Sequence, residues 1–152
     1  MAELTDRLDV LSEKVFDILT TNQEALGLED IWMGDQDRVP RVPAAAVEPG
    51  PKTREWSGAP RRTRVTLDVY VLLYLEVVTG GIQRNVRESA RLSEEVEAVL
   101  HADATLGGLV ISSFVVENAP GYATREKTMM RASRMVLRST SQIQLPMVPE
   151  IP

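Results

Sequence analysis

Thr63 to Val78, TRVTLDVYVLLYLEVV, is the stretch of sequence that decides the fold. Every odd position from 65 to 77 is aliphatic, whereas the even positions are polar at the ends and amphipathic in the middle. Because side chains alternate between the two faces of a strand, this pattern predicts one apolar face and one mixed face. At about 3.3 Å per residue the strand would span roughly 45 Å, well beyond the usual ~5–6 residues. One end is therefore expected to project beyond the core or to bend.

The mixed face of this strand carries large side chains at its centre, Tyr70, Leu72 and Tyr74. A solvated face would be more polar, so we expect a second layer to cover it, with another subunit as one candidate. Tyr70 and Tyr74 are accordingly candidate interface residues.

Two other segments have the periodicity of amphipathic helices. Apolar residues recur at spacings of three and four over 4–21 and again over 86–101, which predicts one apolar stripe on each helix. Gly27 is suited to a left-handed cap where the chain leaves the first helix. His101, the single histidine, falls at the end of the second helix, where its cation would cap the dipole.

The remaining strands are expected to be short or extended. Residues 29–62 read as an irregular, proline-rich segment with short strands at 31–33 and 43–48. A strand at 109–118, a turn at 118–122 and a long extended segment at 127–145 follow. This order predicts a single α+β domain over 1–145, with an antiparallel or mixed sheet of long strands and two amphipathic helices packed on one face. Residues 146–152, PMVPEIP, are expected to form an extended C-terminal tail, either disordered or lying on a neighbour.

The loop expected between residues 50 and 64 is strongly basic. Basic residues interleaved with an aromatic residue are typical of a docking surface for a nucleic acid or a partner protein. The alternative is a solvated hairpin whose tryptophan packs on the sheet. The candidate interface residues are Lys52, Arg54, Trp56, Arg61, Arg62 and Arg64, together with Met147 and Ile151 of the tail.

The composition provides few of the groups that catalysis uses. The chain has one histidine, no cysteine and a net charge of −5, which argues against a thiol or histidine nucleophile system and against a dedicated nucleic-acid binder. No phosphate-binding, dinucleotide or metal-spaced motif is present, and residues 35–37 lack the later ligands of a calcium loop. We therefore expect no catalytic, cofactor or metal site. A hydrolase that acts through carboxylates alone is the enzyme alternative.

The sequence shows no signal for export or membrane insertion. The first ten residues lack the basic and apolar blocks of a signal peptide, and the apolar run 69–75 is too short to span a bilayer. A soluble protein with no membrane partner is expected.

Several of these features together resemble the tail terminator (tail completion) proteins of long-tailed bacteriophages. They are the first amphipathic helix, the edge segment PAAAVEP (43–49), the long strand with Tyr70, and the stretch DATLGGLV (103–110) after the second helix. The resemblance implies a non-enzymatic, ring-forming virion protein of the tail or neck, assembled in the host cytoplasm. The ring, typically a hexamer, would cap the tail tube, stop its polymerisation and join the tail to the head.

The partners that the resemblance implies are further copies of the chain, the major tail tube protein and the head connector or stopper protein. DNA would pass through the ring without being read in sequence. The alternatives are a head-to-tail connector or stopper of the phage neck, a host oligomeric scaffold protein and the carboxylate-dependent hydrolase.

Overall fold

The computed structural model describes residues 3–56, 58, 61–77 and 86–145. Strands β1 (Asp30–Met33), β2 (Ala44–Trp56), β3 (Arg62–Val77), β4 (Ser112–Arg125) and β5 (Thr128–Gln144) form one five-stranded sheet in the order β1-β2-β3-β5-β4. The helices are α1 (Leu8–Thr21), α2 (Gln23–Leu26) and α3 (Val86–His101). The β1–β2 pair is parallel and the other pairs are antiparallel, so the predicted α+β class with a mixed sheet is confirmed.

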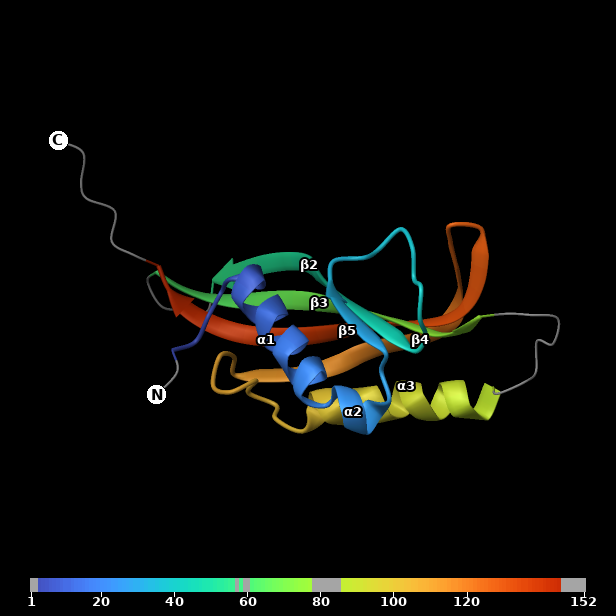
Figure 1. Cartoon of the computed structure of the whole chain (residues 1–152). Helices are drawn as coiled ribbons and strands as arrows, with labels where there is room; N and C mark the ends of the chain where they lie inside the picture. Colours follow the sequence, from blue (N-terminus) through green and yellow to red (C-terminus); the bar gives the residue numbers. More distant parts are fainter. Residues whose placement is uncertain (1–2, 57, 59–60, 78–85, 146–152) are drawn as a thin grey trace.

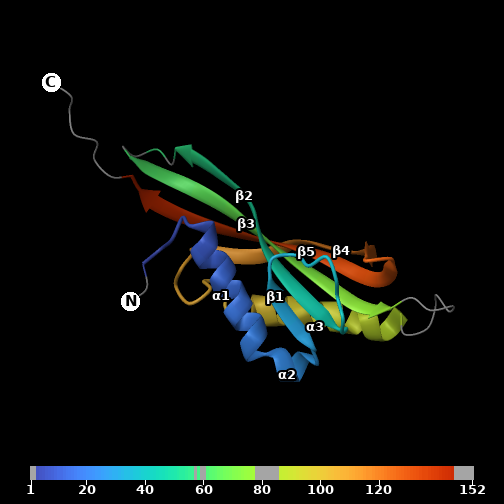
Figure 2. The same ribbon diagram turned by 45° about the horizontal axis from the view of Figure 1, so that its top comes forward.

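The long strand lies at the centre of the sheet, as its two faces predict. β3 pairs with β2 on one side and with β5 on the other, from Arg62 opposite Gln144 to Val77 opposite Met130. The ends of β2, β3 and β5 extend together past α1 (Figure 2). The expectation that one end of the strand projects beyond the core is therefore confirmed.

Both long helices pack on the same face of the sheet (Figure 1). The odd positions of β3 from Val65 to Leu73 are 0 % exposed, and they share one core with Leu11, Leu19 and Leu100 of the helices. Burying each of these side chains contributes about 1.5–3 kcal/mol. The predicted packing of two amphipathic helices on one face is confirmed.

The first helix begins later than its periodicity predicts. Leu4 to Arg7 are not helical, because Thr5 donates a backbone hydrogen bond to Leu109 and ties this segment to the chain before β4.

Where the chain leaves the helices, Gly27 adopts a left-handed conformation with φ 72°, as predicted. The short helix α2 before this residue was not expected from the sequence.

The predicted loop at 50–64 is wrong, because β2 continues to Trp56 and β3 begins at Arg62. The prolines led us to expect irregular chain in this segment. They are compatible with a strand because β1 pairs only with Ala44 to Val47 of β2. Beyond Val47 the strand is an edge of the sheet. Pro49 and Pro51 have no backbone N–H to donate, and on this side no neighbouring strand requires one. A register shift between Pro49 and Lys52 accommodates them.

The turn predicted at 118–122 is also wrong. These residues lie inside β4, the other edge strand, and pair with Met135 to Arg131 of β5. Pro120 is tolerated there because β4 has no partner on its outer side. The chain reverses instead at Glu126 and Lys127, which have φ values of 48° and 66°.

The face of the sheet opposite the helices is covered in part by the chain itself. Tyr74 is 1 % exposed and packs with Ala44, Met130, Val39 and Val42. The segment between β1 and β2 supplies the two valines, so it provides the cover that we assigned to a second layer. Farther along this face the surface is polar.

Candidate interaction surfaces

The β2–β3 hairpin, residues 48–56 and 61–66, forms a projecting structure that we call the arm. Its β2 half is exposed from Pro51 to Trp56, and its end lies beside the end of β5, where Leu145 donates a 2.6 Å backbone hydrogen bond to Arg61. The arm is thus an extension of the central sheet and not a free loop. It places the predicted basic residues and Trp56 at one end of the molecule.

Two of the basic residues are bound to the segment that precedes α1. Lys52 Nζ donates to the Asp6 carbonyl at 3.0 Å, and Arg54 Nη2 lies 2.5 Å from Asp6 Oδ2. The hydrogen bond from Arg54 outweighs the opposing effect of burial and holds the pKa of Asp6 below its usual value. These contacts fix the β2 half of the arm against the segment that precedes α1.

In the outer part of the arm, Thr63 and Val65 are buried, whereas residues 51–56, Arg62 and Arg64 are exposed. Arg64 lies 3.6 Å from Glu55 across the hairpin, and Arg62 is exposed at the start of β3. Trp56 is 69 % exposed, so the alternative in which it packs on the sheet is wrong. An exposed tryptophan among guanidinium groups has the composition of an interface centre.

The two candidate tyrosines have different surroundings. Tyr70 is half-buried on the polar face, with the guanidinium of Arg134 4.5 Å from its ring centre. Tyr74 is interior: its hydroxyl donates to Asp35, which also accepts a 2.6 Å bond from Arg125 Nη2. Burial, followed by the bond to Asp35, raises the pKa of Tyr74 to about 12. We therefore remove Tyr74 from the candidate surface and retain Tyr70.

The polar face also contains a bidentate ion pair. Arg138 donates to both carboxylate oxygens of Asp68, at 2.9 and 3.0 Å, and Asp68 is 6 % exposed. The two hydrogen bonds from Arg138 offset the free-energy cost of burying the charged Asp68 carboxylate.

His101 has a different role from the predicted cationic cap. Its Nε2 accepts a hydrogen bond of 2.9 Å from the backbone N–H of Val115, which requires that nitrogen to be unprotonated. Val115 borders the register shift in β4, so His101 joins the end of α3 to this irregularity.

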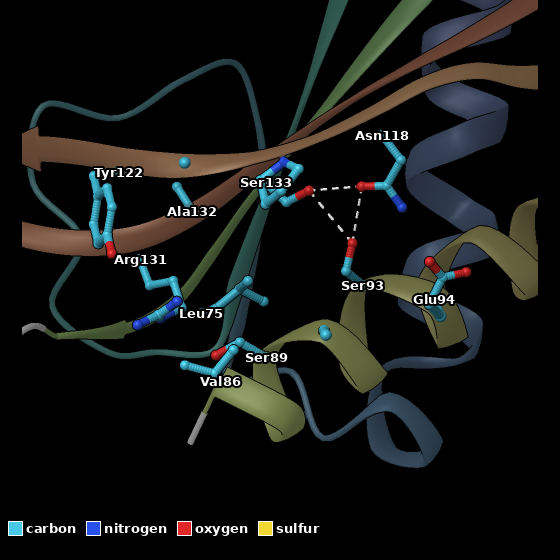
Figure 3. A pocket seen from close by; sticks show the side chains of 13 residues that line it. Leu75, Val86, Ser89, Ser93, Glu94, Asn118, Tyr122, Arg131, Ala132 and Ser133 are labelled. Carbon is cyan, nitrogen blue, oxygen red and sulfur yellow. Dashed lines mark hydrogen bonds between the residues drawn. The ribbon is translucent and has the colours of Figure 1, made fainter. Parts of the chain in front are cut away.

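A cleft of about 410 Å³ lies between α3 and the sheet (Figure 3). α3 contributes Val86, Ser89 and Ala90, and the sheet contributes Leu75, Pro120 and Tyr122. Tyr122 is 55 % exposed and Val86 43 % exposed. The cleft is therefore an open, largely apolar groove at the N-terminal half of α3, and the end of the arm lies at the opposite end of the strands (Figure 1).

A closed hydrogen-bond network forms the polar part of this cleft. Ser93 and Ser133 both donate to Asn118 Oδ1, at 2.9 and 2.7 Å, and Asn118 Nδ2 donates to Glu97 at 3.0 Å. The network connects α3 to β4 and β5 (Figure 3). The two serines and the asparagine are far apart in the sequence, so the cleft was not predicted, and no local motif signals it.

Within the described part of the chain, no group of three or more histidine or acidic residues could hold a metal ion. Asp35 of the calcium-loop fragment is engaged by Tyr74 and Arg125. No helix among the described residues is long and apolar enough to cross a membrane. Met147 and Ile151 lie outside the described residues.

The comparisons with known proteins give a likeness of fold. No protein-family model matches the sequence, and no curated protein sequence matches it. Among solved structures, a chain of the structure described as "Virion of native gene transfer agent (GTA) particle" superposes with a TM-score of 0.56 at 14 % identity. The match covers 87 % of this chain and 94 % of that chain. At this identity the two chains share a fold, extended over nearly all of both.

Proposed function

We propose that this protein is a structural component of a virion, which forms a ring that caps a phage tail tube. The ring ends polymerisation of the tube and joins the tail to the head connector. The observation that carries this proposal is the fold shared along nearly the whole chain with a chain of a gene transfer agent virion.

The distribution of surfaces supports a ring. The end of the arm and the N-terminal half of α3, which lines the cleft, lie at opposite ends of the strands (Figure 1), so one copy can use its arm end against the cleft end of the next. Repeated contacts between two different surfaces give a closed ring when the rotation between copies closes. The copies, the major tail tube protein and the head connector are the proposed partners, and DNA passes through the lumen without sequence-specific contacts.

The character of the cleft supports a non-enzymatic role. The hydroxyls of Ser93 and Ser133 both bind Asn118, and the remaining lining is largely apolar, which suits it to binding a polypeptide. The same arrangement supports neither the carboxylate hydrolase nor a specific host scaffold.

A head-to-tail connector or stopper is the second candidate, because the matching chain belongs to a whole virion particle and both kinds of protein are virion components. Fractionation distinguishes the two: a tail terminator is present on purified tails detached from heads, whereas a connector or stopper is found on heads alone.

The direct test is negative-stain electron microscopy of the purified protein, alone and with tail tubes. A ring seated at one end of each tube supports the proposal. Tubes with bare ends and a protein that remains monomeric overturn it.

A further inference from the structure

We propose that the cleft between α3 and the sheet binds residues 146–152, PMVPEIP, of a second copy of this chain. The inference rests on the proposed ring and identifies the contact that links its neighbouring copies.

The cleft selects an apolar ligand. The side chains of Ser93, Ser133 and Asn118 already bind within the chain, since Asn118 accepts from both serines and donates to Glu97. A ligand therefore gains nothing by offering hydrogen bonds to them, and gains free energy by covering the exposed apolar surface of Val86 and Tyr122. The volume of about 410 Å³ lies within the range of pre-formed binding sites.

The aromatic wall of the cleft suits a proline-rich segment. The guanidinium of Arg131 lies 5.6 Å from the ring centre of Tyr122, and Arg131 is itself fixed by a 3.0 Å bond to Glu76. The ring is thus held in place beside Pro120, with more than half of its surface open. Proline-rich peptides in the polyproline II conformation dock on such pre-positioned aromatic surfaces at low entropic cost.

The sequence of the segment matches this mode of binding. Prolines recur at 146, 149 and 152, a spacing of three. Because a polyproline II helix has about three residues per turn, these prolines would form one ridge, and Val148 and Ile151 would form a second. The only charged residue of the segment, Glu150, would lie on the third edge with Met147.

Residues 146–152 of the same copy cannot reach the cleft. Leu145 is bound to Arg61 at the end of the arm, whereas the cleft begins at Ser133 on β5. The intervening stretch of β5 spans about 40 Å at ~3.4 Å per residue. Residues 146–152 reach about 25 Å when fully extended. Residues 146–152 that occupy the cleft must therefore belong to another copy.

Disulfide trapping tests the contact directly, because the natural chain has no cysteine. Ala90→Cys places a thiol on the exposed rim of the cleft, and Met147→Cys places one in the segment. The two single variants are mixed at the concentration at which wild-type rings form and are then oxidised. The expected product is a mixed dimer of the two variants, which an excess of synthetic PMVPEIP peptide suppresses.

The matched control is Glu117→Cys, an exposed position on β4 outside the cleft. Equal yields of mixed dimer from Ala90→Cys and Glu117→Cys would overturn the inference. Protection of the thiol at position 90 from alkylation, without a cross-link to the thiol at position 147, would also overturn it, because another occupant would then fill the cleft.

Deletion of residues 146–152 separates the inference from the proposed function. Rings that form normally after the deletion contradict the inference and leave the proposed function standing. A wild-type protein that never forms rings contradicts the proposed function itself.

Discussion

The hydroxyl of Tyr74 on β3 donates a hydrogen bond to the carboxylate of Asp35, which lies 39 residues earlier in the chain. Arg125, at the end of β4, binds the other carboxylate oxygen and lies over the Tyr74 ring. This cluster fastens the segment between β1 and β2 across the face of the sheet opposite the helices. Tyr74 lies on the mixed face of β3, and this cluster explains why its side chain is buried.

Removing the Tyr74 hydroxyl should destabilise the fold. Tyr74→Phe keeps the ring but leaves Asp35 without one donor, so we expect a loss of about 1–2 kcal/mol in the free energy of unfolding by urea titration. Tyr70→Phe is the control, since no described residue partners its hydroxyl, and it should change stability by less than about 0.5 kcal/mol. Equal effects of the two substitutions would show that the cluster contributes nothing.

The same cluster should give the protein a specific loss of stability in alkali. The pKa of Tyr74 rises from 10.0 to about 12 in the folded protein, so the folded state favours the neutral phenol. The resulting stabilisation is complete below pH 10 and disappears as the pH rises towards 12. The ultraviolet difference titration between wild type and Tyr74→Phe should have its midpoint near pH 12. A midpoint near 10 is incompatible with the buried hydrogen bond.

Gly50 should be intolerant of a side chain. A Cβ at this position would lie 2.8 Å from the Asp68 carbonyl oxygen and 3.1 Å from Tyr70 Cζ, so Gly50→Ala must displace the backbone at the register shift. We expect a loss of about 1–3 kcal/mol, measured by chemical denaturation. Gly121→Ala is the matched control, because no atom lies within 4 Å of its added Cβ. If the control is as damaging as Gly50→Ala, close approach of the two strands is not the cause.

The network beneath the cleft should stabilise the docking of α3. Asn118→Ala removes the acceptor of both serine hydroxyls and should lower the unfolding free energy by about 1–3 kcal/mol. Amide hydrogen exchange should show faster opening of α3. Glu97→Gln retains an acceptor for Asn118 and should be nearly neutral; a large loss from this control would place the stabilisation in the charge of Glu97.

The arm should be required for assembly but not for folding. Arg62→Glu with Arg64→Glu reverses charge at the exposed end of the arm, while Arg54, bound to Asp6, stays intact. We expect a folded monomer by circular dichroism and loss of rings by sedimentation velocity. The control, Arg38→Glu with Arg41→Glu, makes the same change in net charge at exposed positions between β1 and β2, outside both the arm and the cleft, and should still assemble.

The sequence predicted those helices and strands in which apolar residues recur at a regular spacing. The alternating pattern of β3 and the helical stripes around Leu11 and Val96 each describe an element buried on a defined face, so pattern and structure agree. The left-handed Gly27 was predictable because few other residues adopt that conformation.

The errors concern edge strands and contacts across the sheet. Pro49, Pro51 and Pro120 interrupt a ladder only where both sides of a strand are paired. The edge predicted at 43–49 is wrong for Ala44 to Val47, which pair with both β1 and β3, and the edge begins beyond Val47. The interior position of Tyr74 depends on Asp35 and Arg125, which approach it only in the folded chain. The cleft likewise combines α3 with β4 and β5, so neither its volume nor its network has a local sequence signature.

The proposed function requires that copies of this chain form a closed ring on the end of a tail tube. Mass photometry of the purified protein, paired with electron microscopy of tubes to which it has been added, measures this most directly. We predict one closed species, a hexamer, and a ring on one end of each tube. A protein that stays at the mass of a single chain, both alone and with tubes present, would contradict the claim.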